Sequence, residues 1–135
     1  MTEDPKADLS FSEYESGRRE MAAGNYSKAI KHLQNSIAHT PHFKSLELLG
    51  ESMLAIGNPS AAIVPLAAAA GLGTNEFRAV YLVSKAYFAL GDDPTALRYV
   101  ERALLMRPDF KRARELRDEI NEKLAQRSLS SLPEN

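Results

Sequence analysis

The chain has 135 residues, a length that suits one domain. Hydrophobic residues make up 44% of it and charged residues 26%, which are ordinary values for a globular protein that buries a core. Its net charge of −1 excludes a global attraction to nucleic acid or to an anionic membrane, and the absence of cysteine excludes disulfides, thiolate catalysis and cysteine metal sites.

No targeting or membrane segment is expected. The start, from Met1 to Lys6, is polar and lacks the basic and then apolar layout of a signal peptide. The longest nearly uncharged stretch, 52–75, is interrupted by glycine and proline, so no membrane insertion is predicted. A cytoplasmic location fits these features.

Four kinds of position recur along the chain at intervals of 33 and 34 residues. They are Gly24, Gly57 and Gly91; Ala29, Ala62 and Ala96; Leu33, Leu66 and Val100; and Pro41, Thr74 and Pro108. Self-similarity at one fixed period is typical of repeat proteins, so we expect three copies of one structural unit.

In chain order, each unit predicts two helices joined by a tight turn. The turns are Gly24-Asn25, Gly57-Asn58-Pro59 and Gly91-Asp92-Asp93-Pro94, and each is followed by apolar residues at helical spacing. Glycine takes the left-handed conformation that ends a helix, and Asp92 or Asp93 can cap the next one. Gly17 and Gly50 fall in the middle of helices, where glycine is tolerated if another helix needs the space.

A last helix is predicted over residues 109–127. Ala113, Leu116, Ile120 and Leu124 form one apolar stripe and most other positions are charged, which is the pattern of a helix that caps the end of a repeat array. We expect residues 1–9 to be flexible and residues 128–135 to form a disordered tail.

With these features the chain resembles the tetratricopeptide repeat family over residues 10–43, 43–76 and 77–110. The matching positions are Gly17, Gly50 and Ser84 for the small residue of the first helix, Ala29, Ala62 and Ala96 for the first alanine of the second helix, and Ser36, Ala69 and Ala103 for the next small residue. The resemblance implies an all-α fold of three helix-turn-helix hairpins plus a C-terminal capping helix, arranged as a right-handed superhelical solenoid in a single domain over residues 10–127.

The first unit departs most from the family pattern. Glu13, Ser16 and Glu20 stand where apolar or aromatic residues usually pack, while Phe11 and Tyr14 fall on the opposite side. Two alternatives are open. Either the first helix is rotated to bury Phe11 and Tyr14, or this apolar face is left open for a partner or a second copy of the chain.

The resemblance also implies that the first helix of each unit lines a concave groove. The groove positions are Phe11, Tyr14, Arg18 and Met21, then Lys44, Glu47, Glu51 and Leu54, then Arg78, Tyr81, Lys85 and Phe88, with Arg112 and Glu115 on the last helix. Aromatic and arginine side chains are enriched in binding hot spots. We therefore predict a peptide-binding site made of Phe11, Tyr14, Arg18, Lys44, Glu51, Leu54, Arg78, Tyr81, Lys85, Phe88 and Arg112. The competing interpretation is that these charges pair with one another and the aromatic rings pack between helices.

One subset of the family grips the carboxylate end of large heat-shock chaperones with lysine and asparagine residues. The corresponding positions here are Tyr14, Arg18, Leu48, Arg78 and Leu82. Only the two arginines could serve in that role, so a clamp for chaperone tails is disfavoured.

Catalysis, a cofactor and a metal site are not expected. The sequence has no phosphate-binding glycine loop, nucleophile elbow or metalloprotease helix motif. His39 and His42 flank Pro41 and lack a third ligand nearby. The sequence thus favours a non-catalytic scaffold with a protein or peptide ligand. The alternatives are a secretion-type chaperone or assembly adaptor, and a homodimer formed through the first helix.

Overall fold

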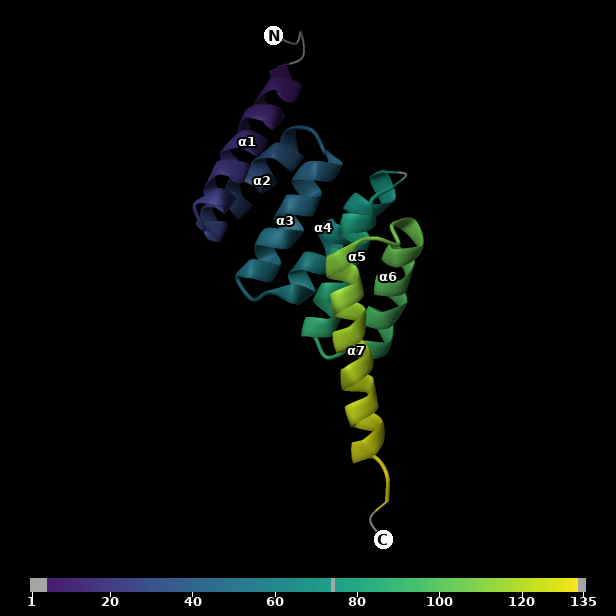
Figure 1. Cartoon of the computed structure of the whole chain (residues 1–135). Helices are drawn as coiled ribbons and strands as arrows, with labels where there is room; N and C mark the ends of the chain where they lie inside the picture. Colours follow the sequence, from purple (N-terminus) through teal and green to yellow (C-terminus); the bar gives the residue numbers. More distant parts are fainter. Residues whose placement is uncertain (1–4, 74, 134–135) are drawn as a thin grey trace.

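The computed structural model describes residues 5–73 and 75–133 of the chain, so Thr74 lies outside the described residues. The described residues form seven α-helices and contain no strand, which confirms the predicted all-α fold. The helices are α1 (Pro5–Ala22), α2 (Tyr26–His39), α3 (Phe43–Ala55), α4 (Pro59–Leu72), α5 (Phe77–Ala89), α6 (Asp93–Met106) and α7 (Lys111–Ser130) (Figure 1).

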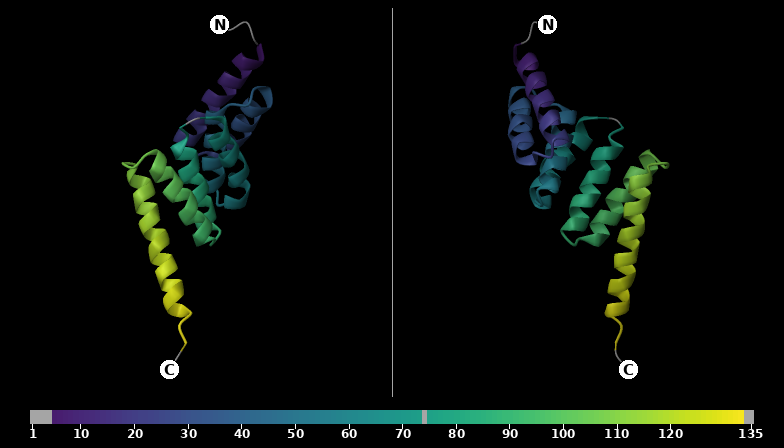
Figure 2. Two further views of the ribbon diagram at one scale, coloured as in Figure 1. Left: turned by 90° about the vertical axis from the view of Figure 1, so that its right-hand side faces the viewer. Right: turned by 60° about the vertical axis from the view of Figure 1, so that its left-hand side comes forward.

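The helices pair into three hairpins that stack into a solenoid. Helices α1 and α2, α3 and α4, and α5 and α6 form the hairpins, and each second helix also contacts the first helix of the next unit. Helix α7 packs against α6 and α5 and closes the array. Both views in Figure 2 show that the C-terminal part of α7 projects beyond the last hairpin. The predicted helical repeat solenoid is therefore confirmed.

The three turns repeat one backbone geometry. Gly24, Gly57 and Gly91 have φ angles of 80°, 81° and 82°, in the left-handed region where a side chain is strained. The next helix is then capped in two of the units. The side chain of Asn58 accepts a hydrogen bond from the backbone amide of Ala61, and that of Asp92 accepts one from Thr95.

Small residues sit where the two helices of a hairpin come closest. A Cβ atom added to Gly17 would lie 2.7 Å from Cγ of Leu33, and one added to Gly50 would lie 2.3 Å from Cγ of Leu66. In the third hairpin the Ser84 hydroxyl occupies this position and donates a hydrogen bond to a carbonyl of the facing helix. The facing residues Leu33, Leu66 and Ala96 are fully buried. This confirms the prediction that the mid-helix glycines leave space that another helix needs.

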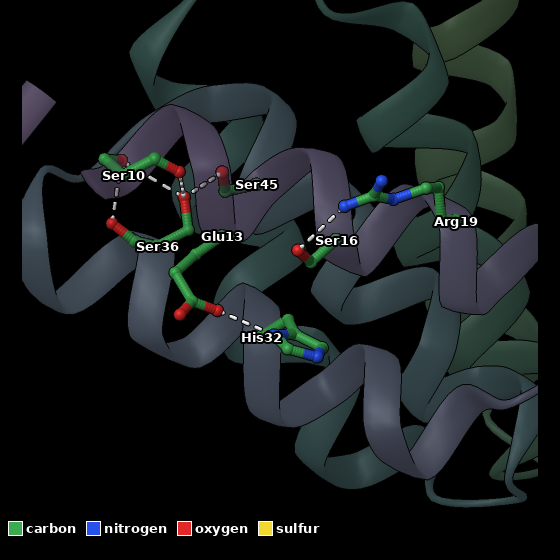
Figure 3. A network of polar contacts seen from close by, with 7 residues as sticks. All are labelled: Ser10, Glu13, Ser16, Arg19, His32, Ser36 and Ser45. Atoms are coloured by element: carbon green, nitrogen blue, oxygen red, sulfur yellow. Dashed lines mark hydrogen bonds and ion pairs between the residues drawn. The ribbon is translucent and has the colours of Figure 1, made fainter. Parts of the chain in front are cut away.

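The first hairpin is held by polar contacts, as Figure 3 shows. The Ser10 hydroxyl donates to the backbone carbonyl of Ser36 at 2.9 Å, and the Ser36 hydroxyl lies 2.9 Å from that of Ser45 on α3. One turn further along α1, a Glu13 carboxylate oxygen lies 2.7 Å from Nδ1 of His32. Helix α1 therefore turns Ser10 and Glu13 toward α2. Phe11 is not buried, with an exposed fraction of 64%, whereas Tyr14 is partly buried and packs against the apolar cluster of Ala29, Leu33 and Leu49.

The helical segments extend further at both ends than the predicted domain. Residues 5–9, predicted to be flexible, form the first turns of α1, because Pro5 is suited to the first position of a helix. Residues 128–130, predicted to belong to a disordered tail, continue α7, where the Ser130 hydroxyl donates to the carbonyl of Gln126. Residues 1–4 and 134–135 lie outside the described residues.

Candidate functional site

The candidate site is the groove, defined here as the face formed by the first helix of each hairpin together with α7. Helix α3 contacts both α1 and α5, and α5 contacts α7, so these four helices follow one another on one side of the solenoid. The predicted binding residues all belong to them. Cavities between neighbouring helices divide these residues into separate groups.

The cavity between α3, α5 and α7 has a volume of about 290 Å³ and is called the α5–α7 cavity below. Its lining contains four of the predicted residues, Glu51, Arg78, Tyr81 and Arg112, and four more, Glu47, Leu82, Phe110 and Lys111. The structure thus brings together predicted residues from three separate helices. It is strongly charged, because three cations and two carboxylates line it.

Aromatic packing fixes one wall of the α5–α7 cavity. The Tyr81 and Phe110 rings meet edge to face with their centroids 5.0 Å apart, and Phe77 packs on Phe110 in the same way at 5.1 Å. Burial raises the pKa of the Tyr81 hydroxyl, although the Arg112 guanidinium acts in the opposite direction. At neutral pH the hydroxyl is therefore a neutral hydrogen-bonding group on a rigid wall.

The cations gather at the amino-terminal end of α7. Lys111 and Arg112 are the first two residues of that helix, and its first turn contains no acidic residue. Arg78 faces the same cavity from α5. The unpaired amide groups at the start of a helix also favour negative charge, so this end of the cavity suits an anionic group, although Nζ of Lys111 already lies 3.9 Å from a carboxylate oxygen of Glu115.

The α3 wall of the cavity is acidic, and one of its carboxylates is buried. Glu47 on α3 has an exposed fraction of 4%, and its Oε2 atom lies 4.0 Å from Nζ of Lys44. Its Oε1 atom accepts no hydrogen bond from the described part of the protein. Burial raises the pKa of this carboxyl; Lys44 and Arg78 act against the shift, while Glu76 and Glu51 add to it.

A second cavity, of about 510 Å³, continues the groove toward α1. Its lining includes the predicted residues Glu51, Leu54 and Lys85 together with Met21 and Tyr26 at the first hairpin. Glu51 lines both cavities, so the two form adjacent parts of one surface. This part of the groove is less polar and offers an apolar floor beside one cation.

The remaining predicted residues lie outside these two cavities. Phe11 and Tyr14 line an apolar cavity of about 300 Å³ between α1 and the start of α3, beside His42, and Phe88 lines a cavity next to the carboxyl-terminal half of α7. Arg18 pairs with Glu15 at 3.2 Å, and Lys44 extends over the Phe43 ring. The single row of binding residues expected from the sequence is thus divided among several surfaces.

Sequence reasoning omitted the contribution of the residues at the start of α7. Phe110 and Lys111 belong to no first helix of a repeat, although they line the α5–α7 cavity. The sequence offered one signal for them. Helix α7 follows α6 in the way that α3 follows α2 and α5 follows α4, so it takes the place of a first helix on the groove side. The repeat pattern places Glu47 on the groove but gives no sign of its burial, which depends on how α3 and α5 pack.

The described residues include no group of three or more histidine, aspartate or glutamate side chains placed to hold a metal ion. Within the same ranges, no helix combines the length and the apolar character needed to cross a membrane.

The fold and the groove are those of helical repeat proteins, which are built from hairpins of two antiparallel helices. Two family models match the sequence: the tetratricopeptide repeat over residues 14–77 and the Fis1 C-terminal tetratricopeptide repeat over residues 78–129. The chain belongs to the tetratricopeptide repeat family. No curated protein matches the sequence.

Solved structures of such domains share this fold. The first tetratricopeptide repeat domain of Spaghetti (RPAP3), bound to the HSP90 peptide SRMEEVD, is 19% identical with a TM-score of 0.85, and the match covers 92% of this chain and 99% of that one. The Sgt2 domain from Aspergillus fumigatus is 18% identical with a TM-score of 0.85, covering 93% and 85%. MamA is 24% identical with a TM-score of 0.82, covering 88% and 70%. At these identities the likeness establishes the fold.

Proposed function

We propose that this protein is a non-catalytic interaction scaffold that binds a peptide or a protein segment in the groove. The observation that carries the proposal is the α5–α7 cavity, where an aromatic wall meets the cations Arg78, Lys111 and Arg112. Tyrosine and arginine side chains are enriched in binding hot spots. The neighbouring cavity, lined by Leu54 and Lys85 among others, lengthens the surface that one extended segment could cover.

The bound structures of similar domains support a segment as the ligand. The first domain of Spaghetti holds an HSP90 peptide, and the second domain of human RPAP3 holds the HSP70 peptide SGPTIEEVD. Function depends on the residues of a site more than on its fold, so the sequence of the ligand has to be inferred from this groove.

The proposed binding residues fall into two groups. Glu51, Arg78, Tyr81 and Arg112 would form the centre, and Leu54 and Lys85 would extend it along the next cavity. Phe11, Tyr14, Arg18, Lys44 and Phe88 lie farther along or beside the groove and would contact only a longer ligand.

Selection of random peptides displayed on phage would test this proposal with the full chain as bait. Peptides that are enriched should bind the wild-type protein in a fluorescence polarisation assay and lose about tenfold or more of their affinity with Arg78→Glu or Arg112→Glu. The matched control is Lys28→Glu, a charge reversal on an exposed position of α2. Equal loss with all three variants, or no loss with any, would place the binding site elsewhere.

Self-association through α1 is a second candidate, favoured by exposed apolar side chains at that edge. Leu9 and Phe11 have exposed fractions of 50% and 64%, and Phe11 lines the apolar cavity beside His42. A dimer contact there would cover both side chains. Light scattering across a concentration series should show a dimer that Phe11→Ser abolishes. A strict monomer at the highest concentration would sink this candidate.

A further inference from the structure

The buried carboxylate of Glu47 is a part of the α5–α7 cavity that a purely acidic ligand does not explain. It lines the same cavity as Arg78, Lys111 and Arg112 and has an exposed fraction of 4%. A buried carboxylate is costly unless it is paired and hydrogen-bonded. Here Lys44 approaches only Oε2, at 4.0 Å, while Oε1 accepts no hydrogen bond from the described residues.

The two carboxylates and the three cations of the cavity come from different helices. Glu47 and Glu51 come from α3, whereas Arg78 comes from α5 and Lys111 and Arg112 come from the first turn of α7. The cavity therefore presents carboxylates from its α3 wall and cations from its α5 and α7 walls to whatever enters it. Its volume of about 290 Å³ corresponds to roughly ten water molecules, which leaves room for a long side chain.

We propose that the α5–α7 cavity selects a segment in which a lysine or arginine stands next to an aspartate or glutamate. The cationic side chain donates to Glu47 and Glu51, and the neighbouring carboxylate is held by Arg78 and Arg112. This specificity rests on the proposed function, since it requires that a segment binds in the groove. Beyond the proposed function, the inference requires that the ligand carries one positive and one negative side chain.

Charge complementarity supports this choice over a ligand of one sign. A wholly acidic segment would bring negative charge toward Glu47 and Glu51, and a wholly basic segment would meet the cations at the start of α7. A dipolar pair satisfies both sides at once. Hydrogen bonds between a cationic donor and a carboxylate are among the stronger ones in proteins, and both charges of the ligand would make them, so each charge is expected to contribute to the selectivity.

Three capped tetrapeptides would test the inference. The probes are acetyl-Leu-Lys-Asp-Leu-amide, the Gln-Asp analogue that lacks the cation and the Lys-Asn analogue that lacks the anion. Each is titrated into the ¹⁵N-labelled full chain and followed by amide chemical shifts. We expect the Lys-Asp peptide to shift the amides around Glu47, Arg78 and Arg112 and to bind about tenfold more tightly than either analogue.

Substitution at Glu47 separates recognition of the cation from general binding. Glu47→Gln should weaken the Lys-Asp peptide to the level of the Gln-Asp peptide and leave the Gln-Asp affinity unchanged. Glu51→Gln, on the more exposed rim, should have a smaller effect in the same direction. Glu122→Gln, on the exposed side of α7, is the matched control and should change neither affinity. An unchanged ¹⁵N spectrum away from the cavity confirms that each variant is folded.

The outcomes distinguish this inference from the proposed function. Equal binding of the Lys-Asp and Gln-Asp peptides in the groove would overturn the dipolar specificity and leave the scaffold function intact. Shifts confined to α2, α4 and α6 would count against both. If none of the three peptides binds, the inference is wrong, and the phage selection decides the scaffold function independently.

Discussion

Gly50 shows at the residue scale how closely the two helices of a hairpin pack. The Cβ atom of an alanine would lie 2.3 Å from Cγ of Leu66, a fully buried side chain. Alanine gains about 1 kcal/mol of helix propensity over glycine, but overpacking a core costs about 1–3 kcal/mol. We expect Gly50→Ala to lower the free energy of unfolding by about 1 kcal/mol in urea titrations.

Gly71 offers the matched control for this substitution. It lies in the last turn of α4, and a Cβ atom there would meet nothing within 4 Å. Gly71→Ala should therefore raise stability by a few tenths of a kcal/mol up to about 1 kcal/mol. A stabilising effect of both substitutions would show that Leu66 moves aside freely.

Glu47 predicts how stability depends on pH. Burial raises the pKa of its carboxyl above the ordinary value of 4.5. The folded state then binds more protons than the unfolded state between the two pKa values, so stability falls as pH rises through that window. Lys44, Arg78, Glu51 and Glu76 set the size of the shift together with burial.

The variant Glu47→Gln should reveal this dependence in thermal melts. At neutral pH the variant avoids burying a charge, so its Tm should equal or exceed that of the wild type. Below pH 4.5 the wild-type carboxyl is also neutral, and the advantage should disappear. A variant less stable than wild type at neutral pH would mean that the Lys44 pair outweighs the cost of burial.

At the scale of one element, helix α7 is held by an apolar stripe and by the contacts of Arg127. Its apolar stripe, with Ala113, Leu116 and Ile120 buried, covers the last hairpin as the sequence predicted. Beyond that stripe one side chain holds the helix: Arg127 donates to the carbonyl of Gly91 at 3.2 Å and lies 3.2 Å from Oδ2 of Asp93. The second contact is an ion pair without hydrogen-bond alignment, because Oδ2 has no hydrogen-bond partner among the described residues.

Removing the Arg127 side chain should loosen the end of α7. Asp93 has an exposed fraction of 1% and would lose its cation, while Arg127 is itself largely exposed and screened by solvent. We expect Arg127→Ala to cost about 1 kcal/mol and to speed amide hydrogen exchange over residues 121–130. Lys123→Ala, on the same helix, should change neither quantity. Protection that persists in Arg127→Ala would show that the apolar stripe alone holds the helix.

The elements themselves were largely predictable from the sequence. Three local signals agree with the tertiary packing: the glycine turns, the small residues at 17 and 50, and the apolar stripe of the last helix. The helix ends were less predictable, because Pro5 and the residues after Arg127 extend helices whose sequences show no apolar period there. The side of helix α1 that packs against α2 is not predictable from the sequence, since only the contacts of Ser10 and Glu13 with α2 show it.

The site was less predictable than the fold for a physical reason. Repeat position identifies which residues face the groove, but cavities form between helices, and their lining depends on how neighbouring units pack. Glu51, Arg78, Tyr81 and Arg112 meet in one cavity, whereas Phe11 and Phe88 line two others. The depth of burial of Glu47 follows from the same packing and had no signal in the repeat pattern.

For the whole molecule, a shared fold should not imply a shared ligand. The Spaghetti domain matches with a TM-score of 0.85 and is bound to SRMEEVD, a peptide with three acidic side chains. In this chain Leu48 and Leu82 are apolar positions that cannot hydrogen-bond a carboxylate, and Glu47 and Glu51 repel acidic groups from the centre of the groove. Calorimetric titrations run in parallel should therefore show at least about tenfold weaker binding of SRMEEVD to this protein than to the Spaghetti domain. Neutralising both carboxylates, in the double variant Glu47→Gln and Glu51→Gln, should recover part of the difference. Equal affinity of the two wild-type proteins would show that the arginines of the groove alone are sufficient to hold an acidic tail.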